Sequence, residues 1–206
     1  LGDENQAIWE GTASFAQIEQ LFKEVRGNVA TCELMTSYRS SPEITAVFTT
    51  LMKRDEGMNV SSVRRPGHTV KFKECLDDEE YFQALETALE SGRNEGGLCA
   101  VIAGSGRRAR WLDRKLRDRM GELAPRLMDG KGRLPEAGCV LLDLKLAKGL
   151  EFDRVIVADA QADEYGEDEL SKHRLYTAIS RATQHLTLVS QGKMTPLLDE
   201  ARSNGN

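Results

Sequence analysis

Short apolar runs alternate along the chain with longer stretches in which apolar residues recur every three or four positions. An apolar run is typical of a strand covered on both faces, and the longer period is typical of an amphipathic helix. The pattern therefore predicts six strands and five helices. The strands are expected at 32–37, 69–75, 98–104, 139–144, 154–160 and 185–190, and the helices at 41–52, 77–91, 106–120, 170–182 and 194–202.

This alternation predicts an α/β fold with a mostly parallel sheet and helices on both of its faces. A chain of 206 residues is long enough for one sizeable core. Two segments, 54–68 and 121–138, read as loops, and the second is expected to be a surface excursion because it contains prolines and glycines.

Composition adds limits to this picture. The chain is 40% hydrophobic and carries a net charge of -5, as expected for an ordinary globular protein. The four cysteines form no CxxC pair, which favours buried free thiols in a reducing, cytoplasmic setting and gives no support to a metal site. Basic residues nevertheless cluster at 107–119, so a basic surface for phosphate backbones remains open.

The first candidate motif is LGDENQ, at the start of the chain. Asp3 is able to orient a water or a basic partner, and Gln6 is able to hydrogen-bond a terminal phosphate. The same residues also suit a solvated turn.

The second motif is YRSSP, which follows a predicted strand and precedes a predicted helix. The ring of Tyr38 is able to stack on a base, and the guanidinium fork of Arg39 fits phosphate oxygens. The alternative places the tyrosine in the core and the arginine in a surface salt bridge.

The third motif, KGLEFD, stands at the mouth of the predicted strand VIVADA, where α/β sheets often bind ligands. Gly149 allows a close approach of the backbone, and Glu151 is able to accept hydrogen bonds from a ribose.

The fourth motif, YTAISRA, places Arg181 between a helix and a strand. An arginine at such a junction is able to reach a nucleotide on a neighbouring domain. The alternative is an arginine that complements the helix dipole.

The order and wording of these four motifs resemble the C-terminal half of superfamily 1 DNA helicases of the UvrD/Rep/PcrA type. The motif pattern GDxxQ, YRS, KGLEF and YxAx[ST]RA is shared, and the strand and arginine-rich helix at 98–116 also resemble that family. The resemblance implies a RecA-like, P-loop NTPase-like α/β fold and an ATP-dependent helicase or translocase that acts on single-stranded DNA.

The resemblance also implies roles for individual residues. Gln6, Arg39 and Arg181 would contact the γ-phosphate of ATP, with Asp3 coupling hydrolysis to strand movement. Tyr38 would stack on adenine, Glu151 would hold the ribose, and Gly149 would give it room. The expected nucleic-acid contacts are Trp9, Arg107 and Lys145.

The chain departs from the family pattern just before KGLEF. The family usually has Thr and His where this chain has Asp143 and Lys145, and an aspartate there is expected to repel phosphate. No room exists before this motif for the accessory domain of UvrD-type enzymes. These departures favour, as an alternative, the HelD-type branch, whose members act on RNA polymerase.

The sequence contains neither GxxxxGK[ST] nor an Asp-Glu motif on an earlier strand. We therefore expect ATP and Mg²⁺ to be held mainly by an N-terminal RecA-like domain of the same protein. Residues 1–28 would end that domain and form a linker, and 29–206 would form the second RecA-like domain. By itself this part is expected to be inactive as an ATPase. A purely non-catalytic binding module is disfavoured because the motif residues are retained.

Overall fold

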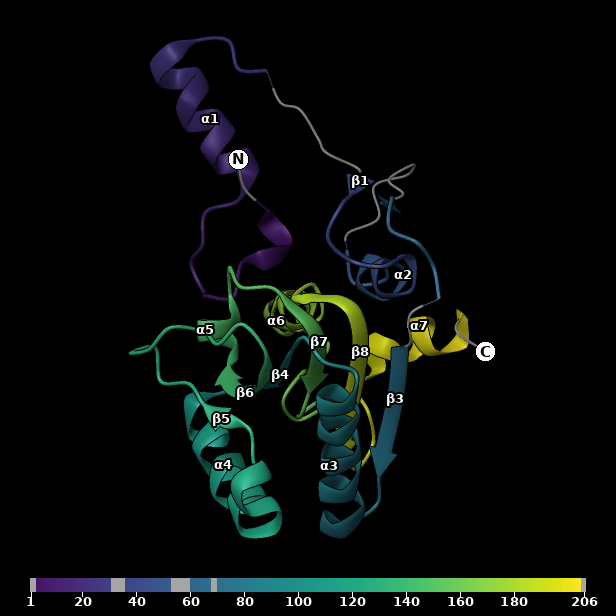
Figure 1. Cartoon of the computed structure of the whole chain (residues 1–206). Helices are drawn as coiled ribbons and strands as arrows, with labels where there is room; N and C mark the ends of the chain where they lie inside the picture. The colour runs from purple at the N-terminus through teal and green to yellow at the C-terminus, as the bar shows by residue number, and fades with distance from the viewer. Residues whose placement is uncertain (1–2, 31–35, 53–59, 68–69, 205–206) are drawn as a thin grey trace.

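The fold centres on one parallel sheet, seen in a computed structural model that describes residues 3–30, 36–52, 60–67 and 70–204 (Figure 1). The sheet has six strands in the order β3-β8-β7-β4-β6-β5, and every paired strand runs parallel to its neighbour. The strands are β3 (Val70–Cys75), β4 (Leu98–Ala103), β5 (Arg126–Leu127), β6 (Gly138–Asp143), β7 (Phe152–Val157) and β8 (Ala182–Gln191).

Helices cover both faces of this sheet, as the sequence predicts. One face packs against α3 (Asp78–Asn94) and α4 (Gly106–Met120), and the other against α2 (Pro42–Thr49), α5 (Leu144–Ala147) and α6 (Glu169–Ile179). The central strand β4 is buried along its whole length and contributes alternate side chains to the two cores. The remaining elements are β1 (Thr36–Ser37), β2 (Ser61–Ser62), α7 (Asp199–Asn204), and the short helical turns η1 (Glu4–Gln6), η2 (Gly121–Leu123) and η3 (Pro196–Leu198).

Local capping explains why several helices begin where they do. The side chain of Asp77 accepts a hydrogen bond from Glu80 N at the start of α3, and Ser105 does the same for α4. Each cap satisfies an amide that has no partner within the helix. Helix α4 spans the residues that the sequence predicts and ends at Gly121, whose φ is +58°.

The structure corrects several boundaries. The segment 121–138 is more than a loop, because it contributes the edge strand β5, which pairs with β6. Helix α6 ends at Ile179, and β8 begins at Ala182, inside the predicted helix. The last predicted helix is a short turn followed by α7. Most of the strand predicted at 32–37, with the loop around 53–59, lies outside the described residues.

The N-terminal part contains a helix that the sequence pattern did not bring out. Helix α1 (Phe15–Arg26) begins with a capping box of Ser14 and Gln17, yet none of its residues is buried. In Figure 1 it stands apart from the sheet. Its apolar side chains are exposed and recur at helical spacing, at Phe15, Ile18, Leu21, Phe22 and Val25.

The KGLEFD motif lies at the amino end of β7, since residues 148–151 precede Phe152. The general expectation for α/β sheets places ligands at the carboxyl ends of strands. The sequence argument from that rule was therefore wrong about the edge, although it chose a segment on which several motifs converge.

Candidate functional site

Hydrogen bonds to main-chain carbonyls gather three motifs at the amino ends of β7 and β8. Phe152 N donates to the carbonyl of Arg181 at 3.0 Å, which places the KGLEF segment beside the end of α6. Ser40 Oγ donates to the carbonyl of Ala182 at 2.7 Å, and this contact brings the adjacent Arg39 to the same place. The sequence motifs thus share one edge of the sheet.

The guanidinium group of Arg181 lies at the centre of this edge and is almost completely buried, with 1% exposure. It donates to the carbonyls of Thr177 at 3.0 Å and Leu150 at 3.3 Å, and to Ser180 Oγ at 3.0 Å. Its fourth contact is Gln6 Oε1, at 3.0 Å. All four acceptors are neutral.

Within the described residues, Arg181 forms no ion pair, and another cation lies nearby. Burial, followed by the positive charge of Arg39, lowers the pKa of the Arg181 guanidinium below its ordinary value. The physical cause is that both effects disfavour the charged form. The charges of Glu151 and Asp3 oppose this lowering more weakly, and neither carboxylate is within ion-pair distance of the guanidinium. The direct anionic contact that a buried cation normally has is therefore missing here.

Arg39 and Glu151 meet across the mouth of the same site. The Nε of Arg39 lies 2.5 Å from Glu151 Oε1, and both side chains remain partly exposed to solvent. Such a pair is able to open at small cost, because exposed ion pairs contribute only about 0–1 kcal/mol. Both groups are therefore available to a ligand.

Two further residues complete this edge, and sequence reasoning gave neither a role there. Lys148 Nζ donates to the main-chain carbonyl of Gln6 at 2.9 Å, which joins the KGLEF segment to η1. The hydroxyl of Tyr176 donates to Asp3 Oδ2 at 3.1 Å, and burial, then the charge of Asp3, raises its pKa. Asp3 also accepts from Gln6 Nε2 at 2.7 Å. The only sequence signal was that both residues lie inside motifs.

Tyr38 and Gly149 occupy the rim of the site. The ring of Tyr38 is 74% exposed, so one face is free to stack. Gly149 has a φ of +87°, and a Cβ there would meet no atom within 4 Å. The backbone conformation therefore explains why position 149 is a glycine, because other residues are strained at such a φ. The described surroundings do not crowd this position.

The predicted nucleic-acid residues fall into two places. Lys145 Nζ lies 4.3 Å from the centroid of the Trp9 ring, and the ring is 52% exposed. Arg107 is exposed on the first turn of α4. Asp143 has a structural role, because its Oδ1 accepts a hydrogen bond from Leu146 N and caps α5.

The carboxyl edge of the sheet holds a second arginine in a different environment. Arg108 Nε donates to Asp159 Oδ1 at 2.7 Å, and Asp159 is only 1% exposed. The hydroxyl of Tyr81 donates to the carbonyl of Ala158 at 2.8 Å and accepts from Arg108 Nη2 at 3.3 Å. Burial is the largest single influence and lowers the pKa of Arg108, but Asp159 and Tyr81 together outweigh it, so the pKa is raised. An internal ion pair thus occupies this edge.

Comparison with known proteins agrees with the motif pattern. A family model described as UvrD-like helicase C-terminal domain matches residues 138–189. The crystal structure of the C-terminal domain of a possible DNA helicase from Lactobacillus plantarum WCFS1 is 30% identical in sequence and aligns with a TM-score of 0.66. The match covers 80% of this chain and 94% of that chain. The chain belongs to the UvrD-like helicase C-terminal domains. No curated protein sequence matches it.

The family match covers the part of this UvrD-like helicase domain that runs from β6 to β8. It therefore includes Lys145, Glu151 and Arg181, whereas Gln6 and Arg39 lie outside it. The fold predicted from the sequence is confirmed. The roles of the individual residues remain predictions, which the geometry above makes specific.

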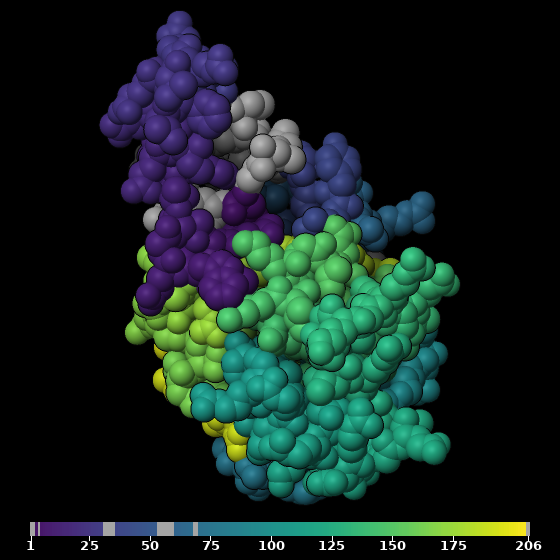
Figure 2. All heavy atoms as spheres, turned by 90° about the vertical axis from the view of Figure 1, so that its left-hand side faces the viewer, coloured from purple at the N-terminus to yellow at the C-terminus, as the bar shows by residue number. Residues whose placement is uncertain are grey.

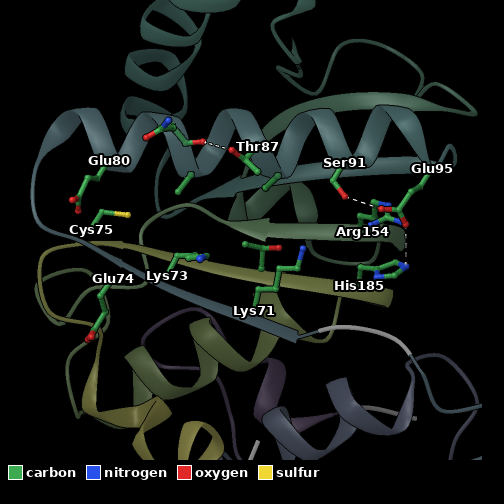
Figure 3. A pocket seen from close by; sticks show the side chains of 14 residues that line it. Lys71, Lys73, Glu74, Cys75, Glu80, Thr87, Ser91, Glu95, Arg154 and His185 are labelled. Atoms are coloured by element: carbon green, nitrogen blue, oxygen red, sulfur yellow. Dashed lines mark hydrogen bonds and ion pairs between the residues drawn. The ribbon is translucent and has the colours of Figure 1, made fainter. Parts of the chain in front are cut away.

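A cavity of this UvrD-like helicase domain lies elsewhere, between α3 and the strands β3 and β8. It has a volume of about 520 Å³ and contains none of the predicted site residues. Figure 3 shows Lys71 and Lys73 directed into it, with Glu95 beside Arg154 and His185 at one end. In this cavity Arg154 is paired with Glu95, and Lys71 and Lys73 are exposed to solvent. Arg181 differs because its charge is buried without an ion-pair partner in the described residues, so we take its surroundings as the candidate site.

Two negative findings apply to the part of the chain that the structure describes. No helix there has the length and hydrophobicity needed to cross a bilayer. Likewise, no group of three or more His, Cys, Asp or Glu side chains is arranged to hold a metal ion.

Proposed function

We propose that this chain is the second motor domain of an ATP-dependent helicase or translocase that moves on single-stranded DNA. Its role is to supply Arg39 and Arg181 to the terminal phosphate of an ATP held by an N-terminal RecA-like domain. Bound ATP would supply the phosphoryl group whose transfer to water drives movement. Mg²⁺ would be held by the partner domain.

The observation that carries this proposal is the buried Arg181, which has only neutral acceptors. A buried cation without a carboxylate is costly, and an arriving phosphate would provide the missing negative charge. Gln6 already touches this guanidinium at 3.0 Å, so the amide is placed beside the same phosphate. Preorganised charge of this kind stabilises a transferring phosphoryl group.

The rim residues support a nucleotide as the ligand. The exposed ring of Tyr38 offers a stacking surface for adenine, and the partly exposed carboxylate of Glu151 offers acceptors for ribose hydroxyls. For Glu151 to do this, its ion pair with Arg39 must open. That opening would release Arg39 toward the phosphate, so both groups change partners together.

Helix α1 supports the existence of a partner domain. Its apolar side chains, among them Leu21, Phe22 and Val25, are exposed although they recur on one side of the helix. An amphipathic helix normally buries such a face. We propose that residues 1–28 belong with the N-terminal RecA-like domain and that 29–206 form the second one.

The test uses the protein that contains both RecA-like domains. Arg39→Ala and Arg181→Lys are each expected to lower kcat for ATP hydrolysis by about 10³-fold or more, the range for arginines that stabilise phosphoryl transfer. Lysine keeps the charge of Arg181 but not its fork of donors. Steady-state phosphate release measures the effect.

Arg202→Ala is the matched control, since Arg202 forms an exposed ion pair with Glu74 away from the motifs. It should hydrolyse ATP at the parental rate. Circular dichroism should show that all variants are folded, which matters most for the buried Arg181. Parental turnover in both motif variants would contradict the proposal.

The RNA polymerase alternative rests on Asp143 and Lys145, which replace the usual Thr and His, and on the lack of room for an accessory domain. Asp143 caps α5, but a hydrogen bond from a main-chain amide does not remove a carboxylate's charge, so the alternative is unchanged. Action on RNA polymerase therefore stays a prediction, to be checked by co-purification with the polymerase.

A further inference from the structure

Helix α4 carries a row of arginines on the side that faces away from the sheet. Its buried residues are Ala109, Leu112 and Leu116. With about 100° between successive residues, the opposite side of the helix carries Arg107, Arg110 and Arg114, all of which are exposed. We call these three residues the α4 row.

The other arginines of this helix are neutralised by partners. Arg108 pairs with the buried Asp159 at 2.7 Å, and Arg117 pairs with Asp113 at 2.8 Å. Arg119 pairs with Glu79 at 2.7 Å and also contacts Glu86. In contrast, the α4 row forms no ion pair with any residue in the described ranges. The arginines of α4 that have no ion-pair partner are therefore those on the side of the helix opposite the sheet.

The first turn of α4 is adjacent to the segment that carries Lys145. A Cβ placed on Gly106 would lie 2.9 Å from Asp143 Oδ2 and 3.6 Å from Arg110 Nη1, so these two groups flank the same glycine. Lys145 follows two residues after Asp143 and covers the ring of Trp9. Figure 2 shows the purple N-terminal segment bordering the green part of the chain, with teal to green residues below on the same face.

We propose that the α4 row, with Arg126 of the adjacent strand β5, binds the backbone phosphates of a nucleic-acid strand that also passes Trp9 and Lys145. This inference rests on the single-strand contact in the proposed function and extends it to a second surface. Arg126 is exposed, and β5 lies against α4. Asp118, one turn after Arg114, ends the row.

The geometry suits a row of phosphates. From Arg107 to Arg114 the helix rises about 10 Å, and arginine forks donate to phosphate oxygens in pairs. Such contacts are independent of base sequence and release counterions, so binding depends strongly on salt. The overall charge of -5 does not oppose this, because the α4 row is concentrated on one face.

The test compares two single-stranded DNA oligonucleotides, a hexamer and a 16-mer, which bracket ordinary single-strand site sizes of about 4–16 nucleotides. The variant is R107Q/R110Q/R114Q, since glutamine maintains helix propensity. Its affinity for the 16-mer should fall at least about tenfold at ~50 mM salt. The slope of log K against log salt should become shallower by about 2, from about 0.7 per lost phosphate contact. Hexamer affinity should remain unchanged.

A control variant removes the same charge from another part of the surface. Lys71 and Lys73 line the cavity beside β3, and Lys193 is exposed after β8. K71Q/K73Q/K193Q should bind both oligonucleotides with the parental salt slope. If it weakens 16-mer binding as much as the row variant, net charge explains the result and the proposal is overturned. An unchanged 16-mer slope in the row variant overturns it equally.

Trp9→Ala separates this inference from the proposed function. It should weaken binding of both oligonucleotides, because it removes a stacking surface worth about 1–3 kcal/mol per base. If Trp9→Ala acts while the row variant does not, only the further inference fails. If Trp9→Ala has no effect on either oligonucleotide, the single-strand site at Trp9 and Lys145 is wrong. The proposal that one strand contacts both this site and the α4 row then fails as well.

Discussion

Each edge of the sheet contains an arginine, an aspartate and a tyrosine, but only at one edge do the arginine and the aspartate form an ion pair. At the carboxyl edge, Arg108 contacts Asp159 directly and also touches the hydroxyl of Tyr81. At the amino edge, Arg181 has Tyr176 and Asp3 nearby, but its guanidinium contacts the amide of Gln6 instead of a carboxylate.

This difference separates a structural cluster from a ligand site. The charge of Arg108 is balanced inside the protein, so the carboxyl edge has nothing to offer an anion. Arg181 is more deeply buried than Arg108, and the charged group with the largest effect on its pKa is another arginine, Arg39. The position of the unbalanced charge therefore favours the amino edge as the ligand site, where the general rule for α/β sheets would favour the carboxyl edge.

Removal of an acid should have the largest effect at the closed edge. Asp159→Ala leaves Arg108 partly buried without its carboxylate and is expected to lower the free energy of unfolding by about 3 kcal/mol. Asp3→Ala removes hydrogen bonds that are exposed or, for the one from Tyr176, only partly buried, and about 1 kcal/mol is expected. Urea unfolding of both variants measures the difference. If both variants lose the same free energy of unfolding, the arginine charge at the amino edge is balanced within the protein as well as that at the carboxyl edge.

The tyrosines of both edges should make stability fall in alkali. Burial, then a neighbouring aspartate, raises the pKa of Tyr81 and of Tyr176 in the folded protein. Stability from a raised pKa is present below the unfolded value of about 10 and is lost above it, by up to about 1.4 kcal/mol per pH unit for each tyrosine.

Phenylalanine variants test this expectation. Tyr81→Phe and Tyr176→Phe should each reduce the loss of unfolding free energy between about pH 10 and pH 11, measured with urea. The hydroxyl of Tyr81 is fully buried, whereas Tyr176 is 7% exposed. A reduction that occurs only in Tyr81→Phe would show that water reaches the amino edge and ionises Tyr176.

A simple anion should distinguish the two arginines by a smaller amount. Sulfate is expected to stabilise the parental protein by on the order of 1 kcal/mol at about ten times its Kd, because it binds the folded state beside Arg181. Arg181→Gln should abolish the increase in Tm, and Arg108→Gln should retain it. Sodium chloride at equal ionic strength removes the general salt effect. The idea fails if Arg181→Gln responds like the parent.

Much of the fold follows from the sequence because the central strands are nearly continuous apolar runs. The segment Leu98–Ala103 has no other stable location than between two layers. Helix α4 was predictable to the residue, because Ser105 caps its start and Gly121 ends it. The convergence of Arg39, Glu151 and Arg181 was expected from the resemblance of their motifs to those of superfamily 1 helicases.

Other features depend on contacts that no local pattern contains. Lys148 reaches the carbonyl of Gln6 across most of the chain, and strand β5 has only two residues, too few for any periodicity. The start of α1 was visible in the capping box of Ser14 and Gln17, but the sequence does not reveal what Leu21, Phe22 and Val25, which are exposed on this helix, would contact. The capping role of Asp143 likewise required the position of the helix that it begins.

The hydrogen bonds around residues 181–183 have a mechanical consequence. Their carbonyls accept from Phe152 N, Ser40 Oγ and Ser41 N, so one stretch of main chain joins the supports of Arg39 and Glu151 to that of Arg181. A displacement of any of these charged groups is passed to the others through peptide bonds that side-chain substitutions leave in place. The amino edge therefore moves as a unit, even in a variant that has lost one of its charges.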